Sequence, residues 1–188
     1  MKRTILNSLG INTTKDIPAD DLFNPAISKE NYGLEDSDIG RLKALKQFFH
    51  QYSAERPMRT STAITTAKEA AGLMYDTLRD LDHEEVWAAF FNRANHVMDR
   101  RQFGIGGLDQ TVIDTRRIIR TALELNASAI ILYHNHPSGN ATPSQNDIRK
   151  TEDLKSTCHL FDIDLMDHII ISNNEYYSFL DSTTDVLI

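Results

Sequence analysis

Hydrophobic side chains recur every three or four residues in several segments of the chain, which is the spacing of one helix face. This pattern predicts helices over residues 37–52, 66–81, 115–125 and 143–159. Two of these segments begin with a capping box, in which a hydroxyl and a side-chain carboxylate or amide satisfy the first backbone groups of the helix. One box pairs Thr66 with Glu69, and the other pairs Thr142 with Gln145 and places Pro143 at the first helical position.

Other segments are rich in β-branched and aromatic residues, which is typical of strands. They predict a hairpin of residues 86–91 and 96–103, a central strand over residues 127–133, and a final pair of strands over residues 165–172 and 176–180. The continuous apolar run at 127–133 indicates a strand that is buried on both faces. The chain therefore mixes helices and strands, and we expect an α/β or α+β fold with a sheet flanked by helices.

The N-terminal part of the chain differs from the rest. Residues 1–35 have weak periodicity, and the polar segment 55–61 contains a proline. We therefore predict a helical or irregular appendage over residues 1–58, followed by the main domain over residues 59–188.

Composition excludes several classes of protein. The chain has 188 residues, of which 40% are hydrophobic and 25% charged, as in an ordinary globular domain. Its apolar runs fall short of the roughly 20 residues of a membrane span, and its first residues do not resemble a secretion signal. We expect a cytoplasmic protein. The single cysteine, Cys158, favours a buried structural thiol and leaves His and carboxylate side chains as candidate metal ligands.

The charge balance is acidic, with 20 Lys and Arg against 27 Asp and Glu. A net charge of -7 argues against nonspecific binding to nucleic acids, which requires a cationic face. Two groups of arginines can still form a local basic strip: Arg93, Arg100 and Arg101, and Arg116, Arg117 and Arg120. Solvated arginines that pair with nearby acids are the favoured interpretation.

The chemistry of the chain is concentrated after the predicted central strand. Residues two apart on a strand point the same way, so His134 and His136 can offer two imidazole nitrogens to one point. Ser144 and Asp147 are three apart at the start of the next helix and share a face that can look back at the histidines. Two imidazoles and a carboxylate are a ligand set for catalytic zinc that leaves the fourth position open.

A water molecule activated by a metal also needs a general base. Glu84 and Glu85 precede the strand at 86–91, and either can reach the site if that strand lies beside the one that ends at His134. His168 is either a further ligand or a core histidine, and the second interpretation is favoured. A structural role for the histidine pair is the alternative, with Asp147 placed by the helix dipole alone.

These residues carry a family resemblance. His134-x-His136, seven residues, Ser144, two residues and Asp147 match the signature of the JAMM (MPN+) metalloproteases. The longer context resembles RadC over about residues 60–182, in segments 84–92, 127–139, 143–144, 167–171 and 178–179.

The resemblance implies a mixed sheet flanked by helices, similar to cytidine deaminase, and a role for each residue. His134, His136 and Asp147 would bind Zn²⁺, Ser144 would stabilise the tetrahedral intermediate, and Glu84, with Glu85 as the adjacent alternative, would be the general acid and base. The implied activity is hydrolysis of a peptide or isopeptide bond in a peptide or protein substrate.

The resemblance also suggests competing functions. RadC proteins commonly carry an N-terminal helix-hairpin-helix that binds DNA, but here only residues 37–52 resemble its last helix. The alternative hypothesis is therefore a DNA-repair accessory that binds DNA or a protein partner, with a structural or vestigial metal site. The adjacent His134-Asn135-His136 does not indicate an HNH nuclease, because that class spreads its residues over a larger unit. A homo-oligomer can form if the last hairpin leaves an unpaired strand.

Overall fold

The computed structural model describes residues 31–55, 62–106 and 114–186, together with Leu6, Gly10, Ile11 and Ile17. The chain divides into two units, Met1–Glu55 and Arg56–Ile188. In the first unit, helix α4 (Asp36–Glu55) contributes Leu42 to a small buried cluster. The other buried members are Leu6, Ile11, Ile17 and Leu34. The segment 55–61 was predicted as a linker. Apart from Glu55, it lies outside the described residues.

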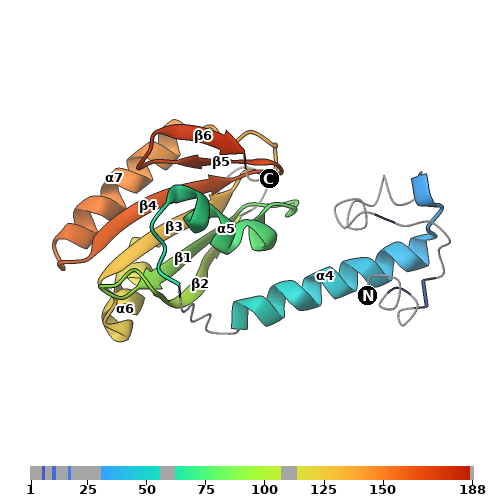
Figure 1. The fold of residues 1–188 in the computed structure, drawn as a ribbon, viewed down its shortest axis with the longest axis horizontal. Helices are drawn as coiled ribbons and strands as arrows, with labels where there is room; N and C mark the ends of the chain where they lie inside the picture. Colours follow the sequence, from blue (N-terminus) through green and yellow to red (C-terminus); the bar gives the residue numbers. More distant parts are fainter. Residues whose placement is uncertain are drawn as a thin grey trace. The chain divides into compact units, whose positions relative to one another are not determined.

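The second unit is built on one six-stranded mixed sheet with the strand order β2-β1-β3-β4-β5-β6. The strands are β1 (Glu85–Phe91), β2 (Val97–Ile105), β3 (Ala129–Asn135), β4 (Asp164–Ile171), β5 (Glu175–Ser178) and β6 (Thr183–Val186). Its helices are α5 (Ala67–Leu78), α6 (Thr115–Leu125) and α7 (Gln145–His159). β3 and β4 are parallel neighbours, and the other neighbouring pairs are antiparallel (Figure 1). The predicted mixed α/β fold is confirmed.

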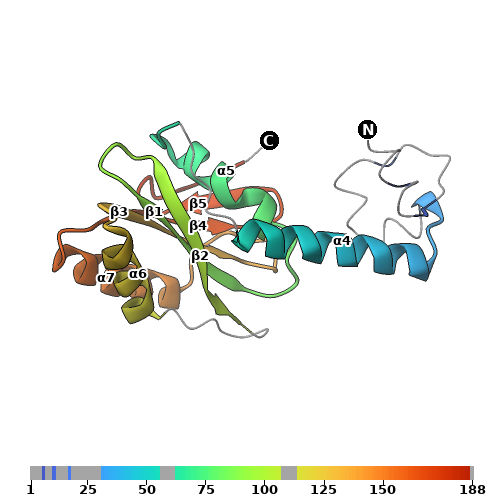
Figure 2. The same ribbon diagram turned by 90° about the horizontal axis from the view of Figure 1, so that it is seen from below.

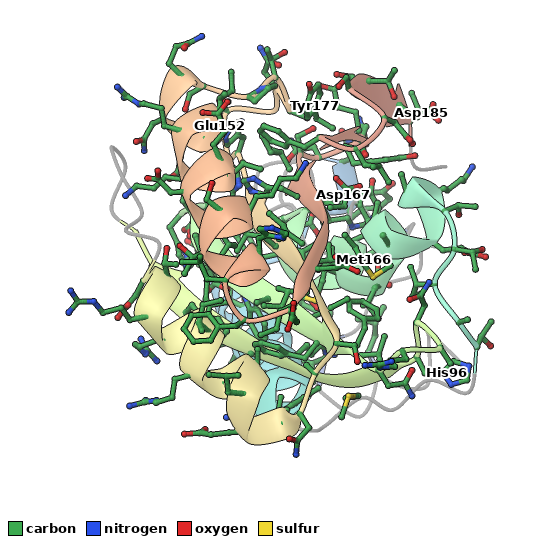
Figure 3. The ribbon with its side chains drawn as sticks, turned by 90° about the vertical axis from the view of Figure 1, so that its left-hand side faces the viewer. His96, Glu152, Met166, Asp167, Tyr177 and Asp185 are labelled. Carbon is green, nitrogen blue, oxygen red and sulfur yellow. The ribbon has the colours of Figure 1, made fainter. Side chains whose placement is uncertain are left out.

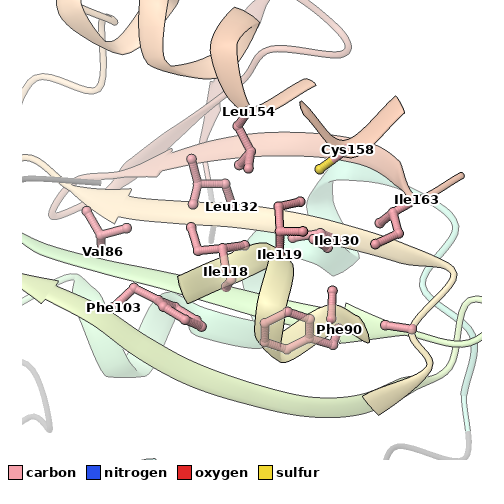
Figure 4. Packing of buried hydrophobic residues seen from close by; sticks show 13 residues of the cluster. Val86, Phe90, Phe103, Ile118, Ile119, Ile130, Leu132, Leu154, Cys158 and Ile163 are labelled. Carbon is pink, nitrogen blue, oxygen red and sulfur yellow. The ribbon is translucent and has the colours of Figure 1, made fainter. Parts of the chain in front are cut away.

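The sheet is covered on both faces. Helix α5 lies on one face, and helices α6 and α7 lie on the other (Figure 2). Alternate residues of a strand point to opposite faces. Val86, Phe90, Ile130 and Leu132 therefore pack together under α6 and α7, where Leu154 joins their cluster (Figure 4). The seven residues of β3 are all buried, as expected of a central strand, but the strand lies two residues later than the predicted 127–133 and so includes His134 and Asn135.

Two details of the predicted elements were wrong. The N-cap of α7 is Ser144 and not Thr142, and Pro143 lies outside the helix. The capping box forms between Ser144 and Asp147. The Asp147 carboxylate accepts a hydrogen bond from the Ser144 N–H, and this contact fixes where the first turn begins. The chain also ends in three strands rather than two, because β6 pairs with β5. The residues of β6 are exposed and polar except Val186, so their sequence has little strand signal.

Within the described segments, no helix combines the length and the apolar character that crossing a membrane requires. The predicted buried thiol is confirmed, since Cys158 is fully buried in the cluster beneath α7. Burial raises the pKa of the Cys158 thiol to about 11. The thiol is therefore protonated at neutral pH and unsuited to act as a nucleophile.

Candidate metal centre

Three side chains predicted as metal ligands converge at the end of the central strand. His134 is the penultimate residue of β3, His136 follows the strand, and Asp147 lies in the first turn of α7. The two histidines face each other through Nε2 atoms 2.9 Å apart. Asp147 places Oδ1 3.3 Å from His134 Nε2 and Oδ2 3.6 Å from His136 Nε2. Among the described residues, this is the one group of at least three His, Cys, Asp or Glu that can hold a metal ion.

The loop between β3 and α7 orients His136. Its Nδ1 lies 2.8 Å from the carbonyl oxygen of Asn140. Because a carbonyl can only accept a hydrogen bond, Nδ1 carries the proton and Nε2 offers its lone pair to the site. Gly139 helps the loop to turn back with a backbone φ of 84°, a conformation that glycine adopts without strain.

Ser144 holds the carboxylate of Asp147. The Ser144 hydroxyl lies 2.6 Å from Asp147 Oδ2 and donates to it, and the Ser144 N–H donates to the same oxygen at 2.7 Å. The Asp147 N–H returns a bond to the hydroxyl oxygen. The cap of α7 therefore also aims the carboxylate at the two imidazoles.

The charges of the site favour a bound cation. Burial alone raises the pKa of Asp147, but its contacts with His134, His136 and Ser144 lower it more, and the net pKa is well below its usual range. Burial lowers the pKa of His136, whereas Asp147, the carbonyl of Asn140 and the charge of Glu84 raise it to a net value above the usual one. Asp147 is thus ionised across the physiological pH range and available as a metal ligand.

Glu84 and Glu85 have different surroundings, which separates the two candidates for the general base. Glu85 is buried and accepts a hydrogen bond from Trp87 Nε1 at 2.7 Å, and its other oxygen lies 3.0 Å from His83 Nε2. Trp87 alternates with Val86, whose side chain packs beneath α6 and α7, so Trp87 lies on the α5 side of the sheet, opposite the candidate metal site. Glu84 precedes the strand by one residue, is partly exposed, and is close enough to act electrostatically on His136.

The register of β1 against β3 explains this arrangement. Val86 pairs with His134, so the start of β1 lies beside the candidate metal ligands. Asn135, whose side chain is on the opposite face from His134, ties the two segments together. Its Oδ1 accepts the Glu85 N–H at 2.8 Å, and its Nδ2 donates to the His83 carbonyl at 2.8 Å. The backbone on both sides of Glu84 is therefore fixed by the residue that lies between the two histidines.

His168 lies behind His134 and is fully buried, as the favoured interpretation of a core histidine required. Its Nε2 is 2.8 Å from His134 Nδ1, its Nδ1 is 2.6 Å from Thr151 Oγ1, and its ring stacks on Phe179. Burial, followed by the charge of His134, lowers the pKa of His168 well below the usual value, so the ring is neutral. Figure 3 shows Asp167, the residue before His168, on β4.

Sequence reasoning missed the supporting residues Asn135 and Thr151. In the sequence, only their spacing from the candidate ligands points to these two residues. Asn135 alternates with the two histidines along the strand, and Thr151 is four residues after Asp147 and so shares its helix face. Neither position indicates which partner the side chain contacts.

Several arginines of the candidate basic strip make local contacts. Arg101 Nε lies 2.8 Å from Asp99, Arg120 Nε lies 3.7 Å from Glu124, and Arg117 donates to the Phe103 carbonyl. Arg100 is buried and donates to the Leu73 carbonyl. These contacts favour the interpretation of arginines engaged with nearby groups over that of a basic strip.

The donor set fits zinc. Two imidazole nitrogens and one carboxylate converge on one point, and a catalytic zinc takes three such ligands and keeps a fourth position open. The exposure of His136 and Asp147 is intermediate, so solvent has access to that side of the site.

The fold and this donor set define a mixed α/β domain with a potential metal centre at the end of its central strand. Residues 64–184 match the model of the RadC-like JAB domain. The chain therefore belongs to the RadC family of JAB-domain proteins, which confirms the resemblance inferred from its motifs.

Several relatives of the chain carry the name UPF0758 protein. One from Flavobacterium johnsoniae is 40% identical over 118 residues, which are 63% of this chain and 52% of that protein. One from Desulforamulus reducens is 38% identical over 125 residues, 66% of this chain and 55% of that protein. One from Desulforudis audaxviator is 33% identical over 189 residues, 93% of this chain and 80% of that protein. The chain thus spans about half the length of the first two relatives.

Proposed function

We propose that the chain is a zinc-dependent hydrolase that cleaves a peptide or isopeptide bond. The observation that carries the proposal is the convergence of His134, His136 and Asp147 beside Glu84. A metal ligand set with an open position and a nearby carboxylate is the arrangement that metal-assisted hydrolysis needs. The substrate class is a peptide or protein.

Each residue has a chemical role in the proposed reaction. When bound, zinc supplies a Lewis acid that polarises the substrate carbonyl and lowers the pKa of a coordinated water to about 7. Glu84 accepts a proton from the attacking water as its oxygen forms a bond to the carbonyl carbon. Glu84 then delivers that proton to the leaving nitrogen as the C–N bond breaks, so the products are a carboxylic acid and an amine, which exchange the remaining proton to give a carboxylate and an ammonium group.

Ser144 has two roles in this proposal. In the structure its hydroxyl donates to Asp147 Oδ2 and holds this ligand in place. The side chain is exposed and borders the site, so rotation of the hydroxyl allows it to donate to the developing oxyanion of the substrate instead. Glu84 and Ser144 are thus the proposed catalytic residues, and His134, His136 and Asp147 the proposed zinc ligands.

The test combines metal content with hydrolysis. The purified full chain is dialysed without chelator, its zinc is measured by elemental mass spectrometry, and cleavage is measured on mixed libraries of peptides and isopeptide-linked peptides. We expect about one zinc per chain and cleavage that His136→Ala abolishes along with the metal. His159→Ala, at the exposed end of α7, is the matched control and retains both. A chain that takes up no zinc, or a His136→Ala variant that still cleaves, contradicts the proposal.

A further inference from the structure

Two of the proposed metal ligands are connected behind the site by a line of hydrogen bonds. The line runs from His134 on β3 to His168 on β4, then to Thr151 on α7, and ends at the backbone carbonyl of Asp147. Thr151 Oγ1 lies 2.6 Å from His168 Nδ1 and 2.6 Å from the Asp147 carbonyl oxygen. His168 is fully buried and Thr151 is 9% exposed, so both act in a dry environment.

The direction of these bonds follows from the number of protons available. The carbonyl of Asp147 can only accept, and the hydroxyl of Thr151 has one proton. When this proton goes to the carbonyl, the hydroxyl oxygen accepts from Nδ1 of His168. A neutral His168 with its proton on Nδ1 has a lone pair on Nε2, which accepts the Nδ1 proton of His134. His134 then keeps its own lone pair on Nε2, which faces Asp147 and His136.

We propose that Thr151 and His168 are positioning residues that hold His134 in the tautomer whose Nε2 lone pair is free to bind a divalent cation. The proposal rests on the metal-binding part of the function proposed above and does not depend on hydrolysis.

If these hydrogen bonds ran in the opposite direction, His134 Nε2 could not bind a cation. If the Thr151 hydroxyl donated to His168 Nδ1, the proton of His168 would move to Nε2 and point at His134 Nδ1. His134 would then carry its own proton on Nε2, the atom that faces the cation. Stacking of the His168 ring on Phe179, with ring centroids 4.7 Å apart and planes 7° apart, keeps both nitrogens in line with their partners.

The first test reads the tautomer directly. Nitrogen-15 NMR of the imidazoles in the zinc-loaded full chain distinguishes a protonated ring nitrogen from one with a lone pair. We expect His168 to be protonated at Nδ1 and bare at Nε2, and His134 to be protonated at Nδ1. A proton on Nε2 of His168 overturns the proposal.

The second test uses variants that differ in one group. Thr151→Val removes the hydroxyl while keeping the shape, and Thr151→Ser keeps the hydroxyl. Thr157→Val is the matched control, because Thr157 makes the same bond to the carbonyl four residues earlier, at 2.8 Å to Asp153, on the same helix. Zinc affinity is measured by competition with a chromophoric chelator.

We expect Thr151→Val to weaken zinc binding about tenfold, the lower end of the range for groups that orient a metal ligand. Thr151→Ser and Thr157→Val should remain within about twofold of the wild type. Equal affinities for Thr151→Val and Thr157→Val overturn the proposal. If Thr151→Val does not fold, the NMR measurement on the wild type decides the question.

The outcomes separate this inference from the proposed function. A wild-type chain that binds no zinc overturns both. A chain that binds zinc with the expected tautomers but cleaves no peptide supports the inference and contradicts the hydrolase. Zinc binding with the opposite tautomer of His168 overturns the inference alone.

Discussion

At the scale of single residues, Glu84 and Glu85 are neighbours in different environments. Glu84 is partly exposed and acts electrostatically on His136, whereas Glu85 is buried against Trp87. Glu84→Gln removes the proposed base but none of the three proposed zinc ligands. We expect zinc content to be unchanged and the hydrolysis rate to fall by about 10²- to 10⁴-fold, the usual contribution of general acid and base catalysis. Elemental analysis and initial rates of peptide cleavage measure the two quantities.

Glu85→Gln is the comparison for this prediction. It keeps an acceptor for Trp87 Nε1 but removes a charge next to His83, on the side of the sheet that faces α5. We expect its rate to remain much closer to that of the wild type. A larger loss of rate in Glu85→Gln than in Glu84→Gln would assign the base to the other carboxylate.

His83 provides a pH dependence of stability. The hydrogen bond with Asp82 raises its pKa, burial lowers it, the contact with Glu85 raises it again, and the net pKa is above the ordinary value of 6.5. The folded state therefore binds this proton more tightly than the unfolded state. The resulting stabilisation is full below pH 6.5 and disappears as the pH rises through the raised pKa of the folded state.

We therefore expect His83→Gln to lower the free energy of unfolding more at about pH 5.5 than at about pH 8.5. Urea unfolding of the chelator-treated wild type and variant at both pH values measures the difference. His96→Gln, which replaces a histidine at the far end of the β1–β2 hairpin, is the control. A larger effect of His83→Gln at the higher pH would reverse the sign and contradict the assigned cause.

The residues of the site differ in how far sequence could predict them. Spacing suggested that His134 and His136 point the same way at the end of the strand, and that Asp147 shares a helix face with Ser144. Their convergence on one point depends on the loop that joins the strand to the helix, and the match to the family signature supplied what spacing could not. Alternation along β1 indicates which face Glu85 shares with Trp87, but not which face carries the candidate metal site. That depends on the register of Val86 against His134, a contact between segments far apart in the chain.

At the scale of secondary-structure elements, Asn135 connects β3 to the segment before β1. Asn135→Ala leaves the Glu85 N–H and the His83 carbonyl without these bonds at a position where Asn135 is 2% exposed. We expect a loss of roughly 1–3 kcal/mol in the free energy of unfolding, the cost of an unsatisfied buried polar group. Because Glu84 lies between the two anchored residues, the hydrolysis rate should fall while zinc is retained.

A matched control exists at the other end of β1. Asn92 also holds two backbone groups, since its Oδ1 accepts the N–H groups of Ala94 and His96. Asn92→Ala should reduce stability without a comparable loss of rate per folded molecule. Equal loss of rate in the two variants, measured on zinc-loaded protein, would show that Asn135 acts through general stability alone.

The elements with strong periodicity or capping signals were predictable, and the weak ones were not. The capping box at Thr66 is present as predicted, because Thr66 and Glu69 contact each other within one turn. The start of α7 was misplaced by two residues since Thr142, Pro143 and Ser144 all suit a helix start, and the choice depends on Asp147. β6 depends on its pairing with β5, which its own residues do not encode.

At the scale of the whole molecule, metal binding should couple to folding. The proposed ligands come from β3, its following loop and α7, so a bound cation links segments that separate on unfolding. Zinc at about 1,000 times its dissociation constant should raise the free energy of unfolding by about 4 kcal/mol. Thermal unfolding with added zinc and with chelator measures this shift. His136→Ala should remove it and His159→Ala should retain it, whereas an equal shift in both variants would place the cation elsewhere.

The two units of the chain should be separable. The buried cluster of Met1–Glu55 and the cluster beneath α6 and α7 share no residue, and every residue of the proposed metal centre lies in Arg56–Ile188. A chain of residues 56–188 therefore keeps its own core and its complete ligand set. We expect it to fold, with strand and helix signals in circular dichroism, and to bind zinc within about threefold of the affinity of the full chain. A truncated chain that folds but binds zinc far more weakly would show that the first unit contributes to the site, and an unfolded one would show that it completes the core.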